Sequence, residues 1–525
     1  MRPASREGAA PELLRVSSTR GRWVLFATIV GSGMSFLDST VVNVALPAMQ
    51  RDFRATLSEV TWVVDAYILT VTAFLLLGGS YADLFGRKRA LRLGLIGFTV
   101  SSALCGLAPT LLTLDIARAL QGLGGALLVP SSLAVLTASF DPSERGRAVG
   151  LWASLSGVGA AIGPLAGGVL VDTLSWRWIF LLNVPIGVLV VLVALPHVPE
   201  SRDEEAEPHL DLAGAALAVV FLAGLTFALI EGPVRGWADP LVVAGFVASV
   251  VGFVAFLVVE RRRRQPMVPL DIFRNRTFSA VNAATLAIYF ALSGATLFIV
   301  LDLQLSRGLS AVAAGAMLLP ITVILLIGSP IAGRMADRIG PRLPMSVGPW
   351  VAAVGLALIA VSSHEGSVLW AVLPGEIVFS IGLALTVAPL TTAVLSALGT
   401  HRAGVASGVN TAVSRFAALV AVAVLPAVSL IGFTRALEER LVQVGLSPAA
   451  QSAVLARRGE QGALVPPAEI PSAVRDAVAD AVRAAFAQGT RLVLAVCALL
   501  LAIGGTIAFV ALRDVERHAE ESKAR

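Results

Sequence analysis

Residues 79–89 read GSYADLFGRKR, and residues 333–342 read GRMADRIGPR. The two stretches share a glycine, an Ala-Asp pair directly before a bulky apolar or basic residue, a second glycine at the same offset, and arginine at the end. Each copy follows a long apolar run, so we expect each to form a short polar turn where a helix leaves the membrane. A repeat in two turns of the same sense predicts two homologous halves in parallel arrangement.

The composition is that of a polytopic membrane protein. Of the 525 residues, 56% are hydrophobic and only 14% are charged, whereas a soluble domain carries about 25% charged residues. Many apolar runs exceed the ~18 residues that cross ~30 Å of hydrocarbon as a helix. The runs lack the alternation of barrel strands, so the expected fold class is an all-α polytopic membrane protein.

Apolar stretches of spanning length occur fourteen times in the chain. They are 23–48, 57–78, 90–108, 112–136, 148–170, 178–196, 211–231, 240–260, 277–303, 310–332, 345–363, 371–397, 404–432 and 489–512. The repeated loops follow the second and tenth stretches, which makes the seventh and eighth an insertion between two six-helix bundles. We therefore expect a cytoplasmic tail 1–22, an N-terminal bundle 23–196, an inserted pair 211–260, a C-terminal bundle 277–512 and a cytoplasmic tail 513–525.

Basic residues concentrate in every second loop, which predicts the orientation. The loops expected inside contain Arg87, Lys88, Arg89, Arg145, Arg147, Arg261, Arg262, Arg263, Arg264, Arg274, Arg276, Arg334, Arg338 and Arg342. An even number of spans then places both termini in the cytoplasm. The net charge of +5 is explained by this topology and by anionic lipid headgroups, with no nucleic acid as partner.

One long loop, 433–488, is expected on the exterior. Val474, Val478, Val482 and Phe486 recur there at helical spacing. This spacing predicts an amphipathic helix that lies on the protein or the membrane surface, with a functional lid as the alternative.

The fifth span, 151–170, reads LWASLSGVGAAIGPLAGGVL. Gly159, Gly163 and Gly167 share one helix face, which lets another backbone approach closely. Pro164 removes a backbone hydrogen bond and favours a kink.

Several motifs carry a specific resemblance. The repeated loop resembles the loop 2–3 signature of the major facilitator superfamily. The stretches 37–47 (LDSTVVNVALP), 118–124 (RALQGLG), 159–168 (GAAIGPLAGG) and 176–185 (WRWIFLLNVP) are similar to motifs of its fourteen-helix drug:proton antiporters, the EmrB/QacA branch. The resemblance covers nearly the whole chain and implies a fold of two six-helix bundles plus two inserted helices. It is specific for the branch and poor for the substrate.

The resemblance also implies gating residues. The loop of this family latches the two bundles together on the cytoplasmic side, and Asp83 with Arg145 or Arg147 is the candidate latch pair. The glycine face is expected to lie against the tenth span, at the seam between the halves. The full set of expected gating residues is Gly79, Asp83, Gly86, Arg87, Arg145, Arg147, Asp337, Gly159, Gly163, Pro164 and Gly167.

Ionisable residues inside the spans are the candidates for proton coupling, because a charge in the bilayer interior is costly. All five histidines lie outside the spans, so coupling must use carboxylates. Asp38 is the expected main proton carrier and Asp65 the second, unless Asp65 instead attracts a cationic drug. A structural hydrogen bond is the alternative for each. Arg118 is expected to hold a neighbouring carboxylate deprotonated, unless it simply pairs with Asp115 on its own helix.

The expected substrate cavity contains Asp38, Asp65, Asn43, Gln121, Asp302 and Arg415. For Asp302 a solvent-exposed position at the rim is the alternative, and for Arg415 a position at the membrane surface. The sequence contains no Walker-type phosphate loop, no metal-spaced His/Cys set and no nucleophile elbow. It therefore predicts neither an ATP-driven pump nor an enzyme, with the proton gradient as energy source and no cofactor or metal.

The predicted function is proton-coupled efflux of hydrophobic and, where charged, cationic drugs or toxic metabolites across a bacterial cytoplasmic membrane. The expected partners are these small molecules, protons and membrane lipids, and the expected state is a monomer. One alternative is an exporter of a single metabolite, such as an amino acid, a siderophore or a self-made antibiotic. The other is a membrane sensor or scaffold that transports nothing.

Overall fold

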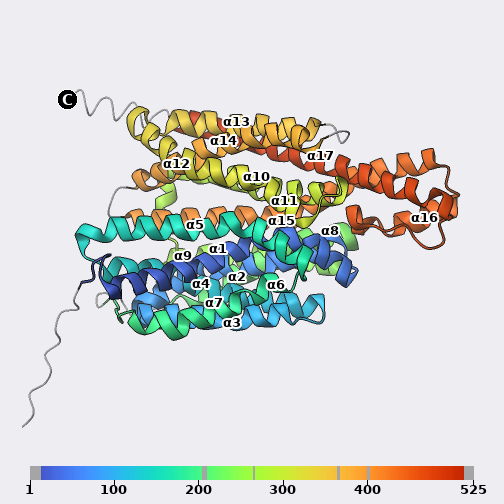
Figure 1. The fold of residues 1–525 in the computed structure, drawn as a ribbon. Helices are drawn as coiled ribbons and strands as arrows, with labels where there is room; N and C mark the ends of the chain where they lie inside the picture. Colours follow the sequence, from blue (N-terminus) through green and yellow to red (C-terminus); the bar gives the residue numbers. More distant parts are fainter. Residues whose placement is uncertain (1–12, 204–209, 264–265, 363–366, 399–401, 513–525) are drawn as a thin grey trace, which may run out of the picture.

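The computed structural model describes residues 13–203, 210–263, 266–362, 367–398 and 402–512 as a bundle of long helices (Figure 1). The expected tail 513–525 and residues 1–12 lie outside these ranges. Within them, β-pairing is confined to one bridge between Leu14 and Phe140. The all-α fold class is thereby confirmed.

The first half of the chain forms seven α-helices, of which the last two share one span with short helical turns. They are α1 (Thr19–Phe53), α2 (Leu57–Phe85), α3 (Arg87–Gly106), α4 (Leu111–Ser139), α5 (Pro142–Thr173), α6 (Trp178–Leu181) and α7 (Asn183–Leu189), followed by η1 (Val190–Ala194) and η2 (Leu195–His197). Two helices then connect the halves, namely α8 (Leu212–Arg235) and α9 (Pro240–Arg262).

The second half begins with the short turn η3 (Leu270–Arg274) and again contains helices of spanning length. They are α10 (Arg276–Leu301) with its extension η4 (Asp302–Ser306), α11 (Ala311–Met317), α12 (Leu319–Ile339), α13 (Arg342–Val361), α14 (Val368–Ala397), α15 (Ala403–Val444) and α17 (Ser472–Ala511). The short helix α16 (Pro448–Ala456) and the turn η6 (Arg458–Ala463) connect the last two.

Thirteen helical segments of the described chain are long and apolar enough to cross a membrane. They coincide with all the expected spans except 90–108, which is helix α3. The 20 residues of α3 reach ~30 Å at ~1.5 Å per residue. Its basic first turn lowers its mean hydropathy, so the fourteenth crossing stays a prediction.

Polar N-cap residues in the loops mark where several spanning helices begin. Thr56 and Glu59 form a capping box at α2, in which each side chain binds the backbone N–H of the other. Asp141 caps α5, and Pro142 follows at a position where no N–H is needed. The amide and hydroxyl of Ser143 both donate to Asp141, which lowers the pKa of this carboxyl. Such caps satisfy the free N–H groups of a first helical turn.

The two halves use the same type of helix crossing. In the first half α3 packs on α4, where a Cβ on Gly94 would lie 3.0 Å from the carbonyl oxygen of Gly124. In the second half α13 packs on α14, where a Cβ on Gly375 would lie 2.8 Å from the carbonyl oxygen of Gly355. Glycine therefore permits both backbones to approach closely. The exact bounds of the two bundles stay a prediction.

The inserted helices α8 and α9 pack mainly on each other. Helix α8 also contacts α2 and α15, so it lies beside the seam between the halves. Leu222 of α8 shares a buried apolar cluster with Leu69 of α2 and Leu419 of α15. Helix α9 exposes a row of large apolar side chains, including Val247 and Val250, and is the peripheral member of the pair.

The sequence analysis expected one exterior loop at 433–488, but the structure shows helices in most of this segment. Helix α15 continues to Val444, and α17 already starts at Ser472. The two helices contain 42 and 40 residues, or ~60 Å each, and extend beyond the other helices toward α16 (Figure 1). Charged residues lower the hydropathy of 433–444, but its apolar side chains keep one face that packs on α17.

The predicted amphipathic helix is the first part of α17. Val478, Val482 and Phe486 are buried in the same core cluster as Phe433 and Leu437 of α15. Their apolar face therefore covers α15 and not the membrane surface. We call the end of the bundle near this extension the α16 end, and the opposite end, where α1 begins and α17 finishes, the terminal end (Figure 1).

Candidate functional site

A buried ion pair joins α1 to α4 in the first half. The Nη1 of Arg118 lies 2.5 Å from Oδ2 of Asp38, and the two side chains are 1% and 0% exposed. Gln121 donates to the other carboxylate oxygen of Asp38 at 2.9 Å. Arg118 also donates from Nε to the carbonyl oxygen of Val63 on α2 at 2.8 Å. The pair thus ties three helices together.

Aromatic and polar side chains surround this pair. The Tyr67 ring of α2 lies 4.4 Å from the guanidinium carbon of Arg118, within the range of a cation–π contact. The Tyr67 hydroxyl is hydrogen-bonded to Ser35 of α1 at 2.7 Å. Ser102 accepts hydrogen bonds from Gln121 and from Asn183. This network fixes Arg118 from several sides.

The alternative that Arg118 pairs with Asp115 is wrong for this structure. Arg118 binds Asp38, and Oδ1 of Asp115 is buried without a hydrogen-bond partner. Spacing on one helix favours the Asp115 pair, but α1 brings Asp38 closer to the guanidinium.

Asp65 lies on α2 between Val63 and Tyr67, which both contact Arg118. It is 0% exposed, and neither carboxylate oxygen has a hydrogen-bond partner among the described residues. A carboxylate charge in such a place is desolvated without compensation. Asp65 therefore differs from Asp38, whose two oxygens are both occupied.

The sequence analysis missed a buried carboxyl of the second half that resembles Asp65 in its surroundings. Glu376 on α14 is 0% exposed, and within the described part of the chain neither of its carboxylate oxygens has a hydrogen-bond partner. It is the only acidic residue of the span 371–397, which is the signal that identifies it. It lies in the opposite half from Asp38 and Asp65.

A polar cavity of about 310 Å³ lies among α10, α14 and α15, and we call it the α15 cavity. Its lining comprises Tyr289, Thr391, Val394, Leu395, Ser407, Asn410, Thr411, Ser414, Arg415 and Ala418. Since α14 ends at Ala397 and α15 begins at Ala403, the cavity lies toward the terminal end. Arg415 lines it, and its Nε is buried without a hydrogen-bond partner among the described residues.

The other expected cavity residues do not line the α15 cavity. Asp38 and Gln121 bind Arg118 instead, and Asp65 is sealed inside the first half. Asp302 is buried in η4, where it forms an ion pair of 2.8 Å with Arg307. Burial of Asp302 also contradicts the alternative of an exposed rim position. Asn43 is half-buried on α1.

The first repeated loop is shaped as the sequence predicts, but its expected ion pair is not formed. Asp83 binds Arg87 at 3.0 Å, four residues later, while Arg145 donates to the carbonyl oxygen of Phe140 and Arg147 is exposed. Arg87 lies only four residues after Asp83, so its side chain reaches this carboxylate more readily than that of Arg145 or Arg147.

Both copies of the loop contain a glycine with positive φ, namely Gly86 at 110° and Gly340 at 84°. A residue with a side chain rarely adopts this conformation, which explains the shared glycine. Gly79 and Asp337 lie at the ends of the helices that lead into these turns. In the first copy, the backbone N–H of Lys88 also donates to Glu200, which lies in the segment between η2 and α8.

The glycine face of α5 packs on α1 and not on the tenth span. A Cβ on Gly159 would lie 2.8 Å from the carbonyl oxygen of Gly33, and one on Gly163 would lie 3.1 Å from that of Leu37. Gly167 faces Val41 of the same helix. The expected contact partner is therefore wrong, because the period of the glycines shows which residues share a face but not which helix covers it.

Helix α5 meets α11, the first part of the tenth span, through residues outside this glycine face. A Cβ on Gly168 would lie 2.7 Å from Cα of Val312, and a Cβ on Gly315 would lie 2.7 Å from the carbonyl carbon of Pro164. The expected seam between the halves is therefore formed by Gly168, the residue directly after the predicted glycine face, and by Pro164. Asp172 adds to it by accepting from the backbone N–H groups of Ala311 and Val312.

Further contacts across the seam lie at the same end. Gln304 of η4 donates to the carbonyl oxygen of Val44 on α1 at 3.0 Å. Gln50 of α1 donates to that of Glu460 in η6 at 2.8 Å. By contrast, a Cβ on Gly146, Gly150 or Gly157 in the terminal-end half of α5 would meet nothing within 4 Å. The described halves are therefore tied together at the α16 end beside α5, while α2 and α15 make a further contact between the halves, with Gly408 of α15 beside Leu76 of α2.

Comparison with known proteins decides the family. Residues 28–422 match the family model of the Major Facilitator Superfamily.

The chain belongs to the Major Facilitator Superfamily.

Two relatives cover almost the whole chain. It is 36% identical to the multidrug resistance protein Stp of Mycobacterium tuberculosis (strain CDC 1551 / Oshkosh) over 91% of this chain and 90% of that protein. It is 32% identical to the tetracenomycin C resistance and export protein of Streptomyces glaucescens over 94% and 92%. These relatives confirm the resemblance to the drug-exporting branch of the superfamily.

A solved structure supports the fold. A bacterial homologue of the human lysosomal transporter Spinster, in an inward-facing and unoccupied conformation, superposes with a TM-score of 0.65 over 95% of this chain and 98% of that one. At 18% identity this similarity shows the major facilitator fold alone.

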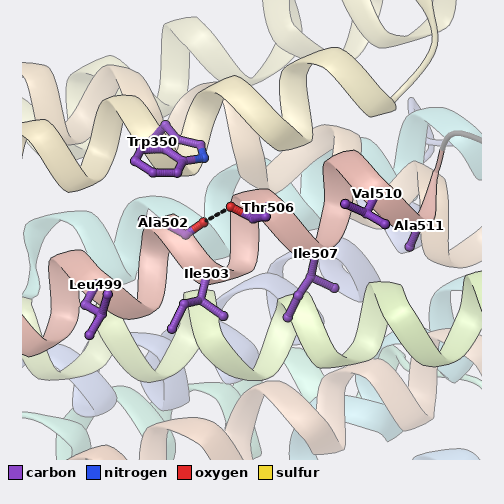
Figure 2. Close-up of a pocket in the computed structure, with 8 residues that line it drawn as sticks. All are labelled: Trp350, Leu499, Ala502, Ile503, Thr506, Ile507, Val510 and Ala511. Carbon is purple, nitrogen blue, oxygen red and sulfur yellow. Dashed lines mark hydrogen bonds between the residues drawn. The ribbon is translucent and has the colours of Figure 1, made fainter.

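Another hollow is larger than the α15 cavity. It measures about 520 Å³ and lies between α13 and α17, where Figure 2 shows Trp350 above a row of α17 side chains. Leu499 and Val510 are 61% and 65% exposed, and the Thr506 hydroxyl donates to Ala502 of its own helix. In a membrane protein this apolar surface faces lipid, so the polar α15 cavity is the better candidate for substrate.

Sequence reasoning missed the residues that support the ion pair. Tyr67, Ser102 and Asn183 come from three different helices, and only the folded structure brings them to Arg118 and Gln121. Asn183 lies within the stretch WRWIFLLNVP that carries the family resemblance. A buried amide in an apolar span is the signal that would have identified it.

Proposed function

We propose that the chain exports hydrophobic drugs or toxic metabolites across the bacterial membrane in exchange for protons. The names of the two relatives, which describe resistance and export, support the cargo class. The buried pair of Asp38 and Arg118 is the observation that carries proton coupling. The protein is expected to act as a monomer with no cofactor.

The proposed orientation places the terminal end in the cytoplasm. The basic loops reach this end, including the repeated turn with Arg87 and Lys88 and the start of α13 at Arg342. Basic loops are retained on the cytoplasmic side during insertion. The extension with α16 is then extracellular, and both termini are cytoplasmic.

Asp38 is the proposed proton carrier. Protonation of this carboxylate removes the charge that holds Arg118, so the ion pair weakens and the contact between α1 and α4 can change. Asp65 is the proposed second site, since its carboxyl is buried beside the same arginine network without a partner. A proton and a bound substrate then drive opposite conformations, which is the basis of antiport.

The seam at the α16 end is the proposed outer gate. Closure there, together with the free space beside Gly146, Gly150 and Gly157 in the terminal-end half of α5, supports access from the cytoplasm. Outward release requires separation of Asp172 from α11 and of Gly168 from Val312. The repeated loops with Asp83 and Asp337 are the proposed latch that closes the cytoplasmic side.

Two alternatives lead to different results. An exporter of one defined metabolite uses the same machinery, but only one compound class moves. A sensor or scaffold moves nothing and tolerates Asp38→Asn.

The test combines resistance with direct proton exchange. A pump-deficient bacterial host that expresses the chain is exposed to a drug panel with and without a proton uncoupler. In everted membrane vesicles, addition of a compound from the panel should release protons, measured with a pH-sensitive dye. The proposal predicts uncoupler-sensitive resistance and proton release that Asp38→Asn abolishes. Resistance that persists with the uncoupler, or proton release that survives Asp38→Asn, contradicts it.

The orientation has its own test. Both native cysteines, Cys105 and Cys497, are buried, so an introduced cysteine is the main site for a membrane-impermeant maleimide. Ser447→Cys lies at the α16 end and Ser143→Cys at the terminal end, and both positions are exposed. In intact cells only Ser447→Cys should react, and the reverse pattern contradicts the proposed orientation.

A further inference from the structure

We propose that the α15 cavity selects substrates that carry a carboxylate or another acidic group, and that Arg415 binds this group. The inference rests on the proposed export function and names the chemical class of its cargo. It departs from the cationic cargo that the intramembrane carboxylates suggest on sequence.

Arg415 has no counter-ion among the residues that the structure describes. It lies in the cavity wall, and within the described chain it has neither an ion pair nor a hydrogen-bond partner at Nε. Arg118 shows the contrast, since its guanidinium is bound by Asp38, Gln121 and the carbonyl oxygen of Val63. Arg415 is half-buried and its Nε is withdrawn from solvent. An arginine in such a place, with no described carboxylate beside it, favours an anionic ligand.

The carboxylates that would attract a cation are withdrawn from the cavity. Asp38 is saturated by Arg118 and Gln121, and Asp302 is bound by Arg307. Asp65 and Glu376 are wholly buried within their own halves. No described carboxylate lines the α15 cavity, so its charge is that of Arg415.

The remaining polar groups suit the neutral part of such a ligand. Both side-chain N–H bonds of Asn410 are used, toward Thr285 at 2.8 Å and Asn282 at 3.1 Å. The hydroxyls of Thr411 and Ser414 donate to carbonyl oxygens of their own helix. These groups leave acceptor oxygens in the wall, so Arg415 is its strong donor.

A ligand that matches this wall has one anionic group for Arg415 and hydroxyl or N–H donors for the acceptors. The ring of Tyr289 and the side chains of Val394 and Leu395 supply apolar contact. A volume of about 310 Å³ lies at the lower end of the range for drug-sized ligands. Hydrophobic weak acids with phenol or alcohol groups fit all three requirements.

Two dyes of opposite charge test the inference. Fluorescein and rhodamine 123 share a three-ring core, but the first is an anion at pH 8 and the second a cation. Binding of each dye to the purified full-length protein is measured by fluorescence anisotropy, together with thermal melting of each variant. The variants are Arg415→Gln, Arg415→Lys and, as control, Arg435→Gln, which removes an exposed arginine (85% exposed) farther along the same helix.

The wild type should bind fluorescein more tightly than rhodamine 123. Arg415→Gln should weaken fluorescein binding by about tenfold or more and leave rhodamine 123 binding unweakened. Arg415→Lys should retain most of the fluorescein affinity, and Arg435→Gln should match the wild type. If Arg415→Gln does not fold, the wild type and Arg415→Lys decide the question by their preference for the anion.

Three results overturn the inference. They are a wild type that prefers rhodamine 123, a wild type that does not bind fluorescein, and an Arg415→Gln variant that weakens both dyes equally. A protein that protects cells against the drug panel but gives one of these results keeps the export function and loses the selectivity for acids.

Discussion

Replacement of Asp38 by asparagine leaves the guanidinium of Arg118 buried without a counter-charge. Both side chains are at most 1% exposed, and the atoms of the pair lie 2.5 Å apart. Loss of one partner from a buried ion pair destabilises a protein by about 3–5 kcal/mol. Asp38→Asn should therefore lower the free energy of unfolding by about this amount and also abolish uncoupler-sensitive efflux.

The double variant Asp38→Asn/Arg118→Gln separates stability from transport. It replaces the ion pair by two neutral amides that can still bind each other and Gln121. Because no unpaired charge is left, its stability should return to within about 1–2 kcal/mol of the wild type. Efflux should remain absent, since no carboxylate is present at this position to carry the proton.

Thermal melting in detergent and dye efflux in everted vesicles measure the two properties on the same preparations. Glu439→Gln is the control, because its partner Arg435 is 85% exposed and such pairs contribute less than about 1 kcal/mol. An Asp38→Asn variant as stable as the wild type would refute the burial argument. Proton-driven efflux by the double variant would refute the role of Asp38 as carrier.

Three other perturbations follow from the same contacts. Gly163→Leu should stop efflux because its side chain meets α1, whereas Gly146→Leu, with nothing within 4 Å of its Cβ, should transport normally; radiolabelled drug efflux compares them. Asp172→Ala removes the acceptor for two N–H groups of α11, at a cost of about 1 kcal/mol. A cysteine introduced as Ala311→Cys should therefore react several-fold faster with an impermeant maleimide in the Asp172→Ala background than with Asp172 present. An unchanged rate argues against an outer gate there. Glu376→Gln removes an unpaired buried carboxyl and should not lower thermal stability, while a clear loss would reveal a partner for its charge.

The helices could be read from the sequence because lipid leaves the backbone no other choice. Apolar runs of spanning length predicted the position of each long helix, and the repeated loop predicted two turns with a glycine. Both features are local, since they depend on hydropathy and on the φ that Gly86 and Gly340 adopt. The loop assignment of residues 433–444 was wrong because hydropathy reports whether a helix lies in lipid or in water, while α15 stays helical after it leaves the apolar layer.

The site could be predicted only in part, because its contacts join distant helices. Charge at membrane depth identified Asp38 and Arg118 as candidates, but spacing on α4 equally favoured Asp115 as the partner. Only the approach of α1 decides between them. The glycine face of α5 shows the same limit, since Gly163 meets α1 while the adjacent Gly168 meets α11.

Helices α2 and α15 connect the two parts of the site. Tyr67 of α2 contacts Arg118 at 4.4 Å in the first half, and α2 packs on α15, the helix of the second half that carries Arg415. A proton on Asp38 neutralises the partner of Arg118 on one side of this helix pair, and an anion on Arg415 neutralises a cation on the other. The two events therefore act on one interface between the halves. Such an arrangement allows proton and substrate to influence each other without direct contact, provided that both bind to the same conformation.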